Sequence, residues 1–145
     1  MKKFSQKLFI IFILFFVLIG CSKDHEVDLT FTERIEVVSI SDPNSVLYTL
    51  EEREEIDDFI NKLHVESWDS DQIPKTAIES KMFKIYKHNV ESVNDRKDEK
   101  QERNEIAAII TTFQDSSFIQ FETKHVTLGF RVPKDVVDNL SNLME

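Results

Sequence analysis

The densest group of possible metal ligands lies near the start of the chain, at Asp24, His25, Glu26 and Asp28. Carboxylate oxygens and imidazole nitrogens are ligands that divalent cations use in proteins. A flexible segment must order its ligands when it binds, and this ordering weakens such a site. The simpler interpretation is a polar spacer, so the four residues are weak candidates only and no metal is assigned.

Aromatic side chains supply the best candidates for contact with a ligand or a partner. Trp68 lies among acidic residues in a segment without a regular pattern, and Tyr48 and Tyr86 are the only tyrosines. Large aromatic residues with one polar atom are enriched where proteins bind other molecules. The same residues also cover hydrophobic cores, which is the alternative interpretation of Trp68.

The sequence contains none of the common catalytic motifs. Gly20 and Gly129 are the only glycines, so a glycine-rich phosphate loop or a dinucleotide motif cannot be formed. A Gly-x-Ser-x-Gly motif and a second cysteine are also missing. The histidines at 25, 64, 88 and 125 are scattered, and no motif gives any of them a chemical role. We therefore predict no catalytic residue and no enzymatic activity.

The first part of the chain has the order of an export signal. Lys2, Lys3 and Lys7 precede an apolar run over residues 8–19, and a cysteine follows at position 21. The lysines stay in the cytoplasm while the apolar run enters the translocon. A membrane-spanning helix needs about 20 apolar residues, so this run is too short to span well. We therefore expect the segment to be cleaved.

The residues Leu18-Ile19-Gly20-Cys21 resemble the lipobox of bacterial lipoproteins, which a dedicated peptidase cuts between Gly20 and Cys21. The resemblance implies that the Cys21 thiol carries diacylglycerol and its amino group an N-acyl chain, with no other cofactor. Two or more acyl chains anchor a protein stably. The expected location is the extracytoplasmic face of the cell membrane. An uncleaved signal anchor, or a secreted protein with a free Cys21 thiol, are the alternatives.

The charge of the chain limits its partners. Removal of residues 1–20 leaves 125 residues with 15 basic and 27 acidic side chains, a net charge of −12. Anionic lipid headgroups repel such a surface, and nucleic acid must be neutralised by Lys and Arg. We therefore expect no nucleic-acid partner, and membrane attachment through the acyl chains alone. A single cysteine also excludes an internal disulfide.

Periodicity predicts strands that are joined by short turns. Alternating or β-branched runs predict strands over 34–40, 46–49, 81–88, 106–113, 118–123 and 126–132. Pro43 and its polar neighbours predict a turn over 41–45, and residues 114–117 a second turn. In the strand over 81–88, Phe83 and Ile85 share one face while Lys84 and Tyr86 share the other.

Two apolar stripes at helical spacing predict helices. The first stripe comprises Ile56, Phe59, Ile60 and Leu63, and the second Val136, Val137, Leu140 and Leu143. Thr49 and Glu52 match a capping box before the first helix, and Pro133 suits the start of the second. The glutamates at 51, 52, 54 and 55 could form an acidic site. The favoured interpretation is a solvated first turn, where the helix dipole stabilises negative charge.

These elements predict the α+β class, as a single small domain with a mainly antiparallel sheet of about five to six strands packed by two helices. The expected organisation is a removed signal over 1–20, a lipidated tether over 21–30 and a domain over 31–145. Residues 89–105 are rich in both charges. We expect a mobile connection or a short exposed helix there, with a pair such as Glu99 and Arg103, rather than a recognition surface.

The layout, from the lipobox to the terminal block over residues 130–137, resembles the small uncharacterised lipoproteins of Gram-positive bacteria, such as the YhfM-like group. It brings no active site to this chain. The favoured function is a non-enzymatic envelope lipoprotein that contacts an unknown envelope protein as an accessory, modulator or inhibitor. The alternatives are a small ligand- or cation-binding lipoprotein and, with the least support, a hydrolase.

Overall fold

The computed structural model of the chain describes residues 28–89 and 103–143. The predictions for Gly20 and Cys21, for Asp24, His25 and Glu26, and for residues 90–102 lie outside the described residues.

The described chain forms a seven-stranded sheet with the order β2-β1-β4-β5-β6-β7-β3, and all of its pairs are antiparallel. The strands are β1 (Thr32–Ser39), β2 (Val46–Leu50), β3 (Asp69–Ser70), β4 (Glu79–Asn89), β5 (Arg103–Phe113), β6 (Phe118–Glu122) and β7 (Thr127–Arg131). The predicted α+β class and antiparallel sheet are confirmed. The predicted strand number is too low because the two-residue β3 forms only by pairing with β7, and its own residues show no strand pattern.

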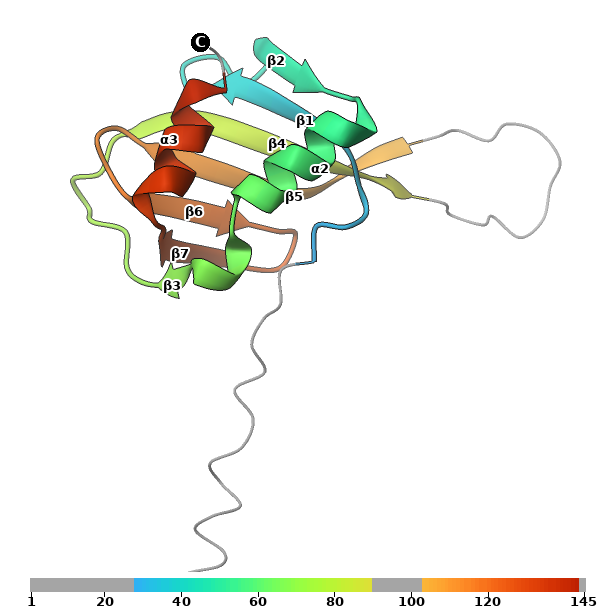
Figure 1. Cartoon of the computed structure of the whole chain (residues 1–145). Coiled ribbons are helices and arrows are strands. Elements are labelled where there is room, and N and C mark those ends of the chain that lie inside the picture. Colours follow the sequence, from blue (N-terminus) through green and yellow to red (C-terminus); the bar gives the residue numbers. More distant parts are fainter. Residues whose placement is uncertain (1–27, 90–102, 144–145) are drawn as a thin grey trace, which may run out of the picture.

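Both helices, α2 (Arg53–Lys62) and α3 (Lys134–Asn142), lie over the same face of the sheet (Figure 1). Ile56 and Phe59 of α2 and Val136 and Leu140 of α3 are buried, as the two apolar stripes predict. A short 3₁₀ helix, η1 (Val65–Ser67), follows α2. In the described part of the chain, the opposite face of the sheet carries no helix.

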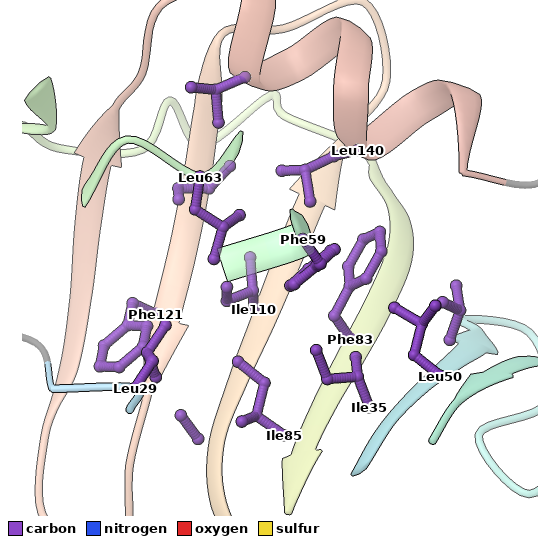
Figure 2. Packing of buried hydrophobic residues seen from close by; sticks show 14 of the residues in the cluster. Leu29, Ile35, Leu50, Phe59, Leu63, Phe83, Ile85, Ile110, Phe121 and Leu140 are labelled. Atoms are coloured by element: carbon purple, nitrogen blue, oxygen red, sulfur yellow. The ribbon is translucent and has the colours of Figure 1, made fainter. Parts of the chain in front are cut away.

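The core is built from the alternate residues of the central strands. Ile35, Phe83, Ile85 and Ile110 are each 0 % exposed, and the register places Ile35 opposite Ile85. The rings of Phe59 and Phe83 stack with centroids 5.7 Å apart, which joins α2 to the sheet (Figure 2). Burying side chains of this size stabilises the fold by about 1.5–3 kcal/mol each. The predicted faces of the β4 strand are confirmed.

The predicted capping box is wrong. Helix α2 begins at Arg53 with Glu52 as its N-cap residue, and no side chain caps it. Thr49 instead belongs to β2, opposite Glu36 of β1. The strand continues through Leu50 because that side chain is buried, at 5 % exposed, beside Ile35.

The fold begins before residue 31. Leu29 is 6 % exposed and belongs to the hydrophobic core, where it lies beside Phe121 (Figure 2). The Leu29 carbonyl accepts hydrogen bonds from the backbone N and the hydroxyl of Thr32, at 3.2 and 2.7 Å. Leu29 therefore belongs to the folded domain and not to the expected tether over 21–30. The charged segment is likewise shorter than expected, because β4 reaches Asn89 and β5 begins at Arg103.

Candidate functional site

Trp68 covers the core. Its Nε1 donates a hydrogen bond of 2.7 Å to the carbonyl of Leu63. Its ring packs at centroid distances of 6.2 Å from Phe121 and 5.3 Å from Phe130. Trp68 is therefore a residue that covers the hydrophobic core, which was the alternative to a binding role. It stabilises the junction of η1 with β6 and β7.

Tyr86 belongs to a polar cluster on the sheet face opposite the helices. Its hydroxyl donates a 2.7 Å hydrogen bond to Glu36 Oε2, and Arg34 Nη2 lies 3.3 Å from Glu36 Oε1. The Arg34 guanidinium carbon also stacks 4.4 Å from the Tyr86 ring centroid. Partial burial, followed by the hydrogen bond to the Glu36 carboxylate, raises the pKa of Tyr86. These contacts are internal to the sheet and engage the polar atom that a ligand would use.

Tyr48 lies on β2, an edge strand of the sheet. Among the described residues β2 pairs only with β1, so its other side has no strand partner. Val46, Leu47 and Tyr48 are 47 %, 48 % and 41 % exposed. The pairing also shifts register at this point, because Val37 and Val38 are opposite Tyr48 and Val46 while Leu47 is left over as a bulge.

A groove of about 290 Å³ opens beside this edge, between α2 and α3. Its apolar lining includes Tyr48, Leu50 and Leu143. Its charged lining comprises Glu55, Asp58 and Lys62, and Lys62 Nζ lies 2.6 Å from Asp58. This volume is at the lower end of what small-molecule pockets have. It suits one or two side chains of a bound segment better than a whole cofactor.

The structure does not bring the three aromatic candidates together. Tyr48 is on β2 and Trp68 packs on β6 and β7, with three strands between β2 and β6. Strands lie about 4.8 Å apart, so the two residues are separated by roughly 20 Å. Tyr86 is on the other face. Sequence reasoning missed Val46 and Leu47 as surface residues, because an alternating apolar run does not reveal that its strand is at an edge.

A larger cleft of about 840 Å³ lies where the β5–β6 turn approaches α3. Its cations are already engaged, since Lys81 Nζ donates to the Ser141 carbonyl at 2.9 Å and Lys134 Nζ lies 2.6 Å from Asp138. Hydroxyl groups of Ser116, Ser117 and Thr112 complete the polar part of a mixed polar and apolar lining, together with Asp115. The lining contains no histidine that could act as a base on these hydroxyls.

Possible metal ligands and histidines do not form a chemical centre in the described part of the chain. No group of three His, Cys, Asp or Glu side chains could hold a metal ion in residues 28–89 and 103–143. Asp28, the one described candidate, accepts hydrogen bonds from the Thr30 hydroxyl and backbone N at 2.6 and 3.0 Å, and these bonds lower the pKa of Asp28. His64 Nδ1 lies 3.3 Å from Glu66 Oε1, but the neighbouring Ser67 hydroxyl donates to the His64 carbonyl rather than to its ring.

Neither α2 nor α3, nor any other described helix, has the length and apolar character needed to cross a membrane. Comparison of the chain with protein-family models, with curated proteins and with solved structures found no match.

Proposed function

We propose that this chain is a lipid-anchored protein of the cell envelope that acts without catalysis, by binding another envelope protein through the β2 edge. It would serve there as an accessory, modulator or inhibitor. The observation that carries the proposal is the edge itself. Three consecutive apolar side chains, Val46, Leu47 and Tyr48, are exposed there, beside a strand side that no other described strand pairs with.

An edge strand of this composition is suited to strand addition. Its free N–H and C=O groups can form main-chain hydrogen bonds with an extended segment of another protein. Natural edges are commonly blocked by charged residues or proline, but β2 reads Val-Leu-Tyr-Thr-Leu and has neither. The bulge at Leu47 and the shortness of the strand limit uncontrolled pairing.

The proposed anchor would keep the folded domain close to the bilayer. Lipid on Cys21 is separated from the first described residue, Asp28, by a segment that spans about 25 Å at most when extended. The net charge of −12 expected after cleavage repels anionic headgroups. The acyl chains would therefore hold the domain at the membrane while its surface stays free for a protein partner.

Site-specific photo-cross-linking in intact cells tests the proposed contact. A benzophenone amino acid at Leu47 should give discrete cross-linked products, and the same probe at Val126, which is 41 % exposed on the β6–β7 turn, should not. The products should disappear when Val46→Lys is added. Identical products from both positions, or none from Leu47, would contradict the proposal.

A separate measurement tests the anchor. Cys21→Ala should abolish incorporation of labelled fatty acid and release the protein from the membrane fraction. The circular dichroism of the folded domain should not change, because residue 21 precedes the core residue Leu29. Full membrane retention of the Cys21→Ala protein would refute lipid anchoring.

The cleft near α3 favours a second candidate, a small ligand- or cation-binding lipoprotein. A cleft of about 840 Å³ is within the size range of ligand sites. Calorimetric titration of the full chain in non-ionic detergent with calcium, zinc and short cell-wall peptides tests it. Heat from a peptide that is lost in Lys81→Met, or heat from a cation that is lost in Asp115→Asn, would support this candidate. Silence with all three probes would dismiss it.

A further inference from the structure

The surface next to the β2 edge is negatively charged, and only part of this charge is compensated by basic side chains. Residues 42–62 contain seven acidic and two basic side chains. Both bases are engaged within α2, because Arg53 pairs with Asp57 at 2.9 Å and Lys62 with Asp58 at 2.6 Å. In the described part of the chain, no cation pairs with the exposed glutamates at 51, 52, 54 and 55.

An added strand would meet this charge at a defined place. Residues directly opposite each other in neighbouring antiparallel strands project to the same face of the sheet. The residue opposite Tyr48 would therefore lie over the groove between α2 and α3, which the exposed Glu55 and the Lys62–Asp58 ion pair line. A long basic side chain can place its methylenes on Leu50 and Leu143 and its charge beside Glu55.

We infer that the segment which β2 receives is an extended strand of alternating apolar and basic residues from another protein. This inference rests on the proposed function, and it names the chemistry of the partner at that same edge. The apolar residues would cover Val46 and Leu47, while the basic residues would pair with the uncompensated glutamates. Complementary charge raises the association rate and selects against acidic partners.

A second copy of this chain is a poor occupant of the edge. Each cleaved copy would carry a net charge of −12, and each places the same glutamates beside the same strand. Pairing two β2 edges would bring these like charges together, at a cost that increases as water is excluded. The charge therefore favours a partner of opposite sign over self-association.

Two synthetic peptides test the inference by fluorescence anisotropy, with the full chain in non-ionic detergent. The basic probe is Lys-Val-Thr-Val-Lys-Val-Thr-Val-Lys, and the acidic probe has glutamate in place of each lysine. The basic probe should bind at least about tenfold more tightly, and added salt should reduce this difference because exposed charges are screened. Equal affinity for the two probes, or no binding of the basic probe, overturns the inference.

Matched variants locate the binding. The combined neutralisation Glu51→Gln, Glu52→Gln and Glu55→Gln should weaken the basic probe about tenfold, whereas Glu122→Gln, exposed on β6, should leave its affinity unchanged. Val46→Lys should weaken the basic probe, and Val126→Lys, which adds the same charge away from the edge, should not. If the affinity of the basic probe is the same after the three glutamate changes, the charges do not select the partner.

The outcomes separate this inference from the proposed function. If cross-linking from Leu47 succeeds while the acidic probe binds as well as the basic one, the edge is a contact site and only the charge preference is wrong. If the basic probe binds at the edge but Leu47 gives no cross-links in cells, the preference of the edge for a basic strand is supported. The proposed contact with an envelope protein is then wrong. Sedimentation that shows a dimer in the wild type and a monomer in Val46→Lys would assign the edge to a second copy and overturn the inference.

Discussion

Gly129 is required by a close crossing of two chain segments rather than by backbone conformation. The described glycine does not have a positive φ, so an alanine could adopt its dihedral angles. A Cβ built there would lie 2.5 Å from the backbone oxygen of Asp71 and 3.0 Å from a side-chain carbon of Ile73. The backbone oxygen cannot rotate away as a side chain can. Gly129→Ala must therefore displace the segment that holds β3.

The cost can be estimated from the contacts that would be lost. The Asp71 backbone N donates a 3.1 Å hydrogen bond to the Gly129 carbonyl, which is worth about 0.5–1.5 kcal/mol. Overpacking adds about 1–3 kcal/mol. We expect Gly129→Ala to lower the free energy of unfolding by about 2 kcal/mol. At a glycine in an open strand, the same substitution would instead raise the free energy of unfolding, because alanine is then favoured by roughly 0.5–1 kcal/mol.

Urea unfolding monitored by tryptophan fluorescence measures this change directly. Trp68 is the only tryptophan, and its ring packs 5.3 Å from that of Phe130, the residue after Gly129. Thr127→Ala on the same strand is the control, and its exposed side chain should change stability by less than about 0.5 kcal/mol. Adding Ile73→Ala should not restore stability, because the contact with the Asp71 oxygen remains. Neutral or increased stability of Gly129→Ala would refute the reasoning.

Two further changes test other contacts of the fold. Leu29→Ala should lower the free energy of unfolding by about 2–4 kcal/mol, because Leu29 is 6 % exposed; no change in the urea midpoint would show that this residue is only tether. Tyr86→Phe should cost about 1 kcal/mol, since it leaves Glu36 without its 2.7 Å donor, and Glu36→Gln in the same chain should make the two losses less than additive. The pKa of Tyr86 is raised by burial and by Glu36, so its contribution to stability is complete below a pH of about 10 and is lost as the pH rises through the raised pKa. Ultraviolet titration of Tyr48→Phe, in which Tyr86 is the remaining tyrosine, should accordingly show ionisation above the ordinary tyrosine value.

The elements with strong periodicity could be predicted from the sequence. Phe83 and Ile85 alternate with polar residues and lie in the core, and the apolar stripes of both helices face the sheet. Such patterns depend on neighbours in the chain, so a single sequence contains them. The class of fold followed from the same information.

Features that depend on strand order could not be predicted in this way. Arg34, Glu36 and Tyr86 meet only because β1 is paired with β4 in one register, with Arg34 opposite Tyr86. The exposure of Val46 and Leu47 follows from the edge position of β2, which local sequence does not specify. The capping box failed for the same reason, because pairing of Leu50 with Ile35 prevailed over the helix signal at Thr49.

The place of β1 in the sheet has a consequence for the time course of folding. Strands β4 to β7 pair in sequence order, whereas β1 must pair with β4 across the intervening hairpin and helix, as in the contact of Ile35 with Ile85. Long loops close more slowly than short ones, so we expect β4 to β7 to form the nucleus and β1 to join it later. If the chain is exported from its N-terminus, as proposed, β1 would be exposed before its partner strand has crossed the membrane. Substitutions at Ile35 should chiefly accelerate unfolding, and those at Ile110 should slow folding, in stopped-flow measurements.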